Sequence, residues 1–202
     1  MDPRARRTTE ALLAAAEALF AERAIDDVTV EQIASRAGVA VASVYNHFGS
    51  KAGLHAALVQ RALDADRRHM DRAYATDRSP VEQLLSAADE YLAFYIANPE
   101  YFRMLAFPGS PGSYPAGREL AERLASSVSE QNERMVKALR AGIAAGAIRT
   151  VDPEDTATAL WAAWNGIISL AWREDRLRRD RDELSRLLRV ATDAFAHGLL
   201  TG

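Results

Sequence analysis

An all-α protein with two domains is the fold that these 202 residues predict. Apolar residues recur at spacings of three and four along most of the chain, which is the period of a helix packed on one face. Helix-start and helix-stop signals separate these stretches. No stretch alternates long enough at period two to form a strand. We expect about nine helices, arranged as a domain over residues 1–50 with a connecting helix over 51–76, and a second domain over 77–202.

Composition excludes several classes of protein. Without cysteine the chain can form neither disulfides nor thiolate metal sites, which fits a cytoplasmic protein. The longest uncharged run, residues 156–172, falls short of the roughly 20 apolar residues that span a bilayer, so we expect no membrane partner. Net charge is −3, and residues 1–60 hold six basic and seven acidic side chains, so bulk charge does not indicate a nucleic-acid partner.

The chain begins with a basic segment and then a helix. Residues 1–8 predict a loose basic arm, which either contacts a partner molecule or is a disordered terminus without contacts. From Thr9 to Arg23 the pattern predicts an amphipathic helix. Its apolar stripe consists of Leu12, Ala16, Leu19 and Phe20.

A helix-turn-helix follows at residues 29–48. Thr29 and Gln32 have the spacing of a capping box, so a short helix begins after Thr29. Gly38 tolerates a left-handed backbone and predicts a sharp turn. A second short helix is expected from Val41 to Phe48. Two short helices joined by such a turn are a helix-turn-helix.

The connecting helix begins at Lys51, where Ser50 can cap it, and runs to about Tyr74. It is apolar at first and charged from Asp64 to Arg72. We expect His55 and His69 of this helix to be surface residues.

Four further segments are expected to be helical, three of them with a start signal. They begin at Ser79-Pro80, at Asn98-Pro99, at Ala116 or Arg118, and at Asp152-Pro153. The third ends near Ala145, before Gly146. Residues 108–117, rich in Pro and Gly, form a loop that is either a connector or a flap over a pocket.

The segment from Pro153 to Trp172 is apolar on nearly all sides, so it must be covered on all sides. The simplest cover is a second copy of the chain. A last helix is expected from about Asp182 to Leu200.

The stretch GVAVASVYNHFGSKAGL resembles the TetR family of transcriptional regulators. The family pattern matches at Gly38, Val39, Tyr45, His47, Phe48, Lys51 and Leu54. One position departs from it: Ala40 stands where the family has Ser or Thr, so a hydroxyl cap of the second helix is missing.

The resemblance implies that the second short helix enters the major groove of DNA. The implied base-facing residues are Val41, Ala42, Ser43, Asn46 and His47. Among them Asn46 suits a bidentate contact with adenine, and Val41 or Ala42 suits a thymine methyl group. The implied phosphate contacts are Thr29, Tyr45, His47 and Lys51. Packing inside the domain is the alternative for Tyr45 and His47.

For the second domain the resemblance implies a homodimer through residues 153–172 and 182–200, and a small-molecule effector. A mostly apolar effector with one or two polar anchors fits the candidate lining. That lining is Tyr91, Tyr95, Phe102, Met104, Met135, Leu139, Trp161, Trp164, Asn165 and Ile168. Core packing is the alternative for each of these residues, and the effector is unknown.

The function implied is a ligand-responsive repressor that binds palindromic operator DNA, with an activator of the same family as the alternative. A helical enzyme is a third hypothesis. No His-Glu-x-x-His, phosphate-binding loop or nucleophile-elbow spacing supports it, and we expect no catalytic residues, no cofactor and no metal.

Overall fold

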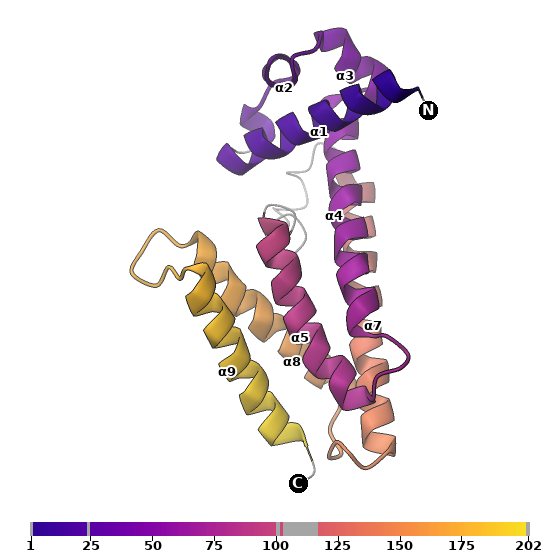
Figure 1. The fold of residues 1–202 in the computed structure, drawn as a ribbon, viewed down its shortest axis with the longest axis vertical. Helices are drawn as coiled ribbons and strands as arrows, with labels where there is room; N and C mark the ends of the chain where they lie inside the picture. The colour runs from indigo at the N-terminus through magenta and orange to yellow at the C-terminus, as the bar shows by residue number, and fades with distance from the viewer. Residues whose placement is uncertain (1, 24, 100–101, 103–116, 201–202) are drawn as a thin grey trace. The chain divides into compact units, whose positions relative to one another are not determined.

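The computed structural model describes residues 2–23, 25–99, 102 and 117–200. Contacts divide the chain into two compact units: Met1–Asp64 with Glu100–Ala125, and Ala65–Pro99 with Ser126–Gly202. The described residues form eight α-helices, two short 3-10 helices and one isolated bridge between Ile148 and Leu200 (Figure 1). This confirms the all-α prediction. The expected helix after Asn98 lies mostly outside the described residues, as does most of the loop over residues 108–117.

The first unit begins with α1, Pro3–Glu22, six residues earlier than expected. The prediction of a loose arm is wrong because Asp2 and Pro3 are themselves a helix start. The Asp2 carboxylate accepts from the Arg4 N–H at 3.0 Å, and Pro at the first position loses no helical hydrogen bond. Thr9 lies inside this helix, and its hydroxyl donates to the carbonyl of Ala5 at 3.0 Å.

The helix-turn-helix forms at the predicted residues, as α2 (Val30–Ala37) and α3 (Val41–Phe48). The Gln32 N–H donates to the Thr29 hydroxyl at 3.3 Å, and the Thr29 N–H donates to the Gln32 side chain at 3.0 Å, so the capping box is confirmed. Gly38 has a φ of 68°, in the left-handed region where a Cβ would be strained. Packing of α2 and α3 on α1 encloses a core (Figure 1). Its fully buried members include Leu12, Ala16, Ile33, Val44 and Leu54.

Helix α4, Lys51–Ala73, contributes to both units, and the Ser50 hydroxyl caps its first turn by accepting from the Gly53 N–H at 3.0 Å. The second unit continues with α5 (Pro80–Ala97), α7 (Gly117–Ala144, from Ser126 onward), α8 (Pro153–Ile168) and α9 (Arg181–Leu199). Side chains of Ser79, Asp152 and Asp180 cap three of these helices. The helix expected to reach Trp172 ends as an α-helix at Ile168, and Ser169–Trp172 tighten into a 3-10 turn.

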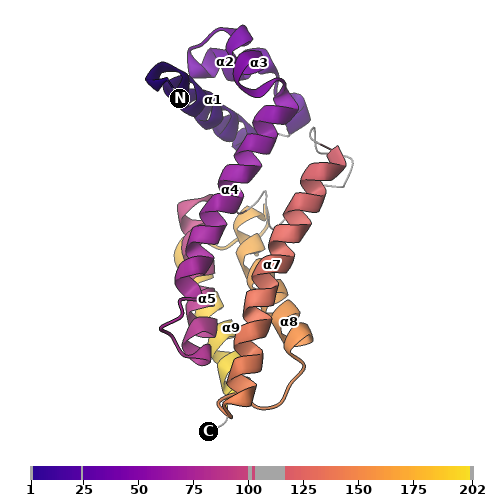
Figure 2. The same cartoon turned by 90° about the vertical axis from the view of Figure 1, so that its right-hand side faces the viewer.

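Ion pairs fix the register between α4 and α7 in the second unit. Arg67 lies 3.6 Å from Glu130, and Arg134 lies 2.7 Å from Asp71. Both pairs differ by 63 in residue number, so the two helices run parallel there, side by side in Figure 2.

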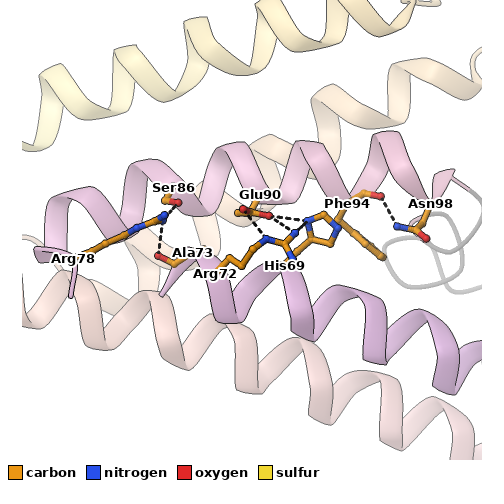
Figure 3. Close-up of polar contacts among 8 residues, drawn as sticks. All are labelled: His69, Arg72, Ala73, Arg78, Ser86, Glu90, Phe94 and Asn98. Atoms are coloured by element: carbon orange, nitrogen blue, oxygen red, sulfur yellow. Dashed lines mark hydrogen bonds and ion pairs between the residues drawn. The ribbon is translucent and has the colours of Figure 1, made fainter. Parts of the chain in front are cut away.

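A carboxylate on α5 ties that helix to α4 (Figure 3). Glu90 accepts from Arg72 at 2.7 and 3.0 Å and pairs with His69 at 2.8 Å. Burial alone would raise the pKa of Glu90, but the hydrogen bonds from Arg72 and His69 outweigh burial and lower it.

Neither His55 nor His69 is a surface residue, so that expectation is wrong. His55 is fully buried with its ring edge-on to Phe20 at 5.8 Å, and His69 pairs with Glu90. Both positions lie on stripes of α4 that face other helices. Burial, with the charge of Lys51 as a smaller cause, lowers the pKa of His55 to about 4, so its ring is neutral at pH 7.

Candidate nucleic-acid interface and effector site

Helix α3 divides cleanly into a buried side and an open side. Val44 is fully buried and anchors the helix in the first unit. Ala42, Asn46 and His47 are exposed, and Tyr45 keeps 51% of its surface accessible. A short helix that is anchored on one side and open on the other presents three or four side chains to the major groove. The remaining candidates, Val41 and Ser43, are half-buried at the edges of that face.

The start of α3 is open as well. The N-cap is Ala40, and no side chain caps the helix there. Uncapped N–H groups and the positive end of the helix dipole favour an anion.

A hydrogen bond between α1 and α3 sets the orientation of the His47 ring. His47 Nδ1 lies 3.2 Å from the Thr9 hydroxyl, which donates its single hydrogen to the carbonyl of Ala5. Nδ1 is therefore the donor to Thr9. In the neutral ring Nε2 is then an acceptor, suited to a base amine, and it becomes a phosphate donor only when the ring is protonated. The two roles expected for His47 thus belong to two charge states.

Thr29 and Lys51, two of the expected phosphate contacts, also hold the first unit together. Thr29 is the N-cap of α2. The Lys51 ammonium donates to the carbonyl of Val28 at 2.9 Å, which ties the start of α4 to the segment before α2. An ammonium group has three N–H donors, and the bond to Val28 uses one of them.

Sequence reasoning missed the helical conformation of the first turns of α1. Arg4, Arg6 and Arg7 are exposed on a formed helix, and Arg6 lies one turn before Thr9, the residue bonded to His47. The Asp2-Pro3 start signal could have revealed this. In contrast, Arg36 pairs with Glu22 at 3.0 Å.

The expected effector lining gathers only in part. Tyr91, Trp161, Trp164 and Asn165 form one network in the core of the second unit. The Tyr91 hydroxyl donates to the Asn165 side chain at 2.9 Å and is hydrogen-bonded by the Trp161 side chain. Asn165 in turn donates to the Trp161 carbonyl at 2.8 Å, and the Tyr91 and Trp164 rings lie 5.9 Å apart. Burial raises the pKa of Tyr91, so its hydroxyl stays protonated.

Five of the other candidates lie among the described residues. Met135, Leu139 and Ile168 are buried in the second unit, whereas Tyr95 stacks edge-on with Trp172 at 5.7 Å. Phe102 belongs to the first unit, where it is buried, and Met104 lies outside the described residues.

The sequence prediction missed two polar residues in the core of the second unit. Asp66 is only 7% exposed, although it lies in the charged part of α4. Its spacing from Ala62, Met70 and Ala73, which are buried, is the signal that could have found it. Gln131 is the other residue, one turn before Met135 on α7. The residue is half-buried, and neither atom of its buried amide has a hydrogen-bond partner among the described residues.

Two kinds of site are absent from the described residues. No described helix is long and apolar enough to cross a membrane. No group of three or more His, Cys, Asp or Glu side chains in the described ranges could hold a metal ion.

The geometry defines a class of protein: a three-helix unit that presents the second helix of a helix-turn-helix to DNA. Comparison with protein families agrees. The model for bacterial regulatory proteins of the tetR family matches residues 12–58, and that for the tetracyclin repressor-like C-terminal domain matches residues 84–195. The chain belongs to the TetR family of transcriptional regulators.

Two curated relatives illustrate the range of the family. The chain is 30% identical over 103 residues to the HTH-type transcriptional activator FasR of Mycolicibacterium smegmatis, covering 51% of this chain and 47% of FasR. It is 26% identical over 137 residues to the nucleoid occlusion factor SlmA of Vibrio cholerae, and this match covers 66% of this chain and 65% of SlmA. The matches thus span about half of the first relative and just under two thirds of the second.

Solved structures share the whole fold. The complex of SmeT with triclosan matches with a TM-score of 0.76 and 25% identity, over 96% of this chain and 92% of SmeT. SmeT itself is described as the repressor of a multidrug efflux pump of Stenotrophomonas maltophilia. A TetR-family regulator from Agrobacterium tumefaciens matches with a TM-score of 0.76 at 17% identity, over 98% and 100% of the two chains. These relatives are regulators rather than enzymes, in agreement with the prediction.

Proposed function

We propose that this regulator binds a two-fold-symmetric operator as a homodimer, represses transcription from it, and is released by a small, mostly apolar effector. The open face of α3 is the observation that carries the proposal. Asn46 lies near its centre, exposed and able to make two hydrogen bonds to adenine, with the Ala42 methyl group one turn earlier.

Phosphate contacts would come from around this face. Tyr45 and Lys51 supply a hydroxyl and an ammonium group, and Arg6 adds a charge from α1 on the side where Thr9 meets His47. Such contacts position a protein on the duplex and make its affinity fall with salt.

The dimer is supported by the outer faces of α8 and α9. On α9, Val190, Ala194 and Gly198 follow one another at intervals of four residues, and Val190 is 61% exposed. Ala159 of α8 and the Ala194 and Gly198 positions line the same shallow groove. Small exposed residues in such a row allow two helix pairs to approach closely, and an apolar row is stabilised when it is covered.

An effector site is supported by the network around Tyr91 and Asn165, which places polar groups among buried aromatic rings. SmeT, a relative with a similar fold, forms a complex with triclosan. A site of this kind suits a ligand with an apolar body and few polar anchors.

Activation is the second candidate function, because FasR is named an activator. Transcription in vitro from the bound promoter, with and without the protein, separates the two. An increase in transcription on adding the protein would show that the protein activates this promoter and does not repress it.

Footprinting of the DNA that flanks the protein's own gene tests the main proposal. A protected site with two-fold symmetry supports it, and the absence of protection on every duplex, with no effector added, would refute it.

Sedimentation tests the dimer: Val190→Asp should give monomers and weaken operator binding. Leu177→Asp, at a site that is 52% exposed outside these helices, is the matched control and should remain dimeric.

A further inference from the structure

Asp66 is a carboxyl group buried in the core of the second unit. Its exposed fraction is 7%, and no hydrogen bond or ion pair joins its carboxyl to another residue that the structure describes. Burying a carboxylate costs free energy unless it is paired, so native proteins seldom keep one in this state without a use for it.

The cations nearest to Asp66 are already paired at the surface. Arg67 has a side chain that is 53% exposed and pairs with Glu130, and Arg134 pairs with Asp71. Their charges lower the pKa of Asp66, but burial is the larger effect and raises it to about 6. At pH 7 the carboxyl is therefore mostly ionised, while no basic group of the described chain binds it directly.

Other unpaired polar groups lie in the same core. The α4–α7 register places Gln131 level with residue 68, about half a turn from Asp66, and its amide atoms are buried without partners. Trp164 is 3% exposed, and its indole nitrogen also lacks a partner. Tyr91 and Asn165, in contrast, satisfy each other.

Aromatic rings complete the surroundings. Burial raises the pKa of Tyr91, and the charge of Asp66 is a smaller cause of the same rise, so the two groups interact. The Tyr91 ring lies 5.9 Å from that of Trp164. A buried carboxylate in a core that also holds Tyr and Trp rings is a combination that suits an organic cation, since carboxylates and aromatic rings both attract positive charge.

Neutral and anionic ligands fit less well. An anion would be repelled by Asp66, and a neutral ligand would leave the carboxylate unpaired. An ammonium group would pair with the carboxylate, and the Gln131 carbonyl oxygen offers a second acceptor.

From this geometry we infer that the effector of the second unit is an organic cation, an apolar amine whose ammonium group is bound by the Asp66 carboxylate. The inference rests on the proposed effector response and adds the charge of the ligand to it.

Three probes with one apolar cage and different head groups test the inference: adamantan-1-amine, adamantan-1-ol and adamantane-1-carboxylate. Binding to the full chain is measured by calorimetry and by the fluorescence of the three tryptophans, all of which belong to the second unit. We expect the amine to bind at least about tenfold more tightly than the alcohol, and the carboxylate least tightly.

Asp66→Asn keeps the shape of the side chain and should bring the amine and the alcohol to similar affinity. The control, Asp64→Asn, removes the same charge from an exposed position of α4 and should keep the preference.

The inference is overturned if the amine does not bind more tightly than the alcohol, and this includes the case in which neither compound binds. It is also overturned if the Asp66→Asn variant still binds the amine more tightly than the alcohol. Circular dichroism of each variant verifies that it is folded. Fluorescence anisotropy of operator binding in the presence of each probe distinguishes the two proposals. If the amine binds at Asp66 and leaves the operator complex intact, the proposed release by effector fails and the cation site stands. If the alcohol releases DNA at the same concentration as the amine, the cation site fails and the proposed release by an effector stands.

Discussion

Replacing Asp66 by Asn should make the protein more stable at neutral pH. In the folded chain burial raises the pKa of Asp66 from about 3.8 to about 6, against the lowering effects of Arg134 and Arg67. The folded state therefore binds the proton more tightly than the unfolded state, and stability falls as pH rises from about 4 to 6. Two pKa units correspond to roughly 3 kcal/mol lost at pH 7.

The net gain of Asp66→Asn is smaller, because the amide is also buried without partners. An unsatisfied amide costs about 1–2 kcal/mol, which leaves a gain of roughly 1–2 kcal/mol. For a chain of this length each kcal/mol corresponds to about 2–4 °C in Tm.

Thermal unfolding followed by circular dichroism measures this gain at pH 7.5 and at about pH 4. The gain should be present at pH 7.5 and should disappear or turn into a small loss at about pH 4, where Asp66 is protonated in the folded wild-type chain and only the cost of the buried amide remains. Asp64→Asn, on the exposed side of the same helix, should change stability by less than about 0.5 kcal/mol at both pH values. A variant that is less stable at pH 7.5, or a gain that does not depend on pH, would show that the carboxyl is not an unpaired buried charge.

Three further predictions concern the first unit. Lys51→Ala should weaken binding to every duplex and lower the slope of log affinity against log salt by about one, measured by anisotropy. The matched variant Lys137→Ala, exposed on α7 of the second unit, should leave that slope unchanged, and an unaltered slope for Lys51→Ala would exclude the phosphate contact. Asn46→Ala should cost about 1–3 kcal/mol on the preferred operator and relax selection at one base pair in a binding-site selection experiment. His55 has a folded pKa lowered from 6.5 to about 4, so the unfolding free energy should fall by at most about 3 kcal/mol as pH drops through this range. His55→Leu should remove that part of the pH dependence in urea titrations, and an unchanged pH profile would contradict the neutral buried ring.

Local signals explain which elements the sequence predicts correctly. The Thr29 capping box, the left-handed Gly38 and the Ser79-Pro80 start each depend on a few neighbouring residues, and all three form as expected. The start of α1 is also local, but its signal was overlooked because the basic residues that follow suggested an arm. The domain boundary expected near Asp77 and the roles of the DNA-facing residues stay predictions.

The sequence by itself determined the helices, their caps and the helix-turn-helix, because each follows from residues within one or two turns of one another. Only the tertiary structure decided which polar side chains are enclosed. His55, Asp66 and Gln131 are placed in the interior by helices distant in the sequence, and burial then determines their charge and hydrogen bonding. Desolvation depends on everything packed around a group, so the charge pattern of one helix could not reveal it.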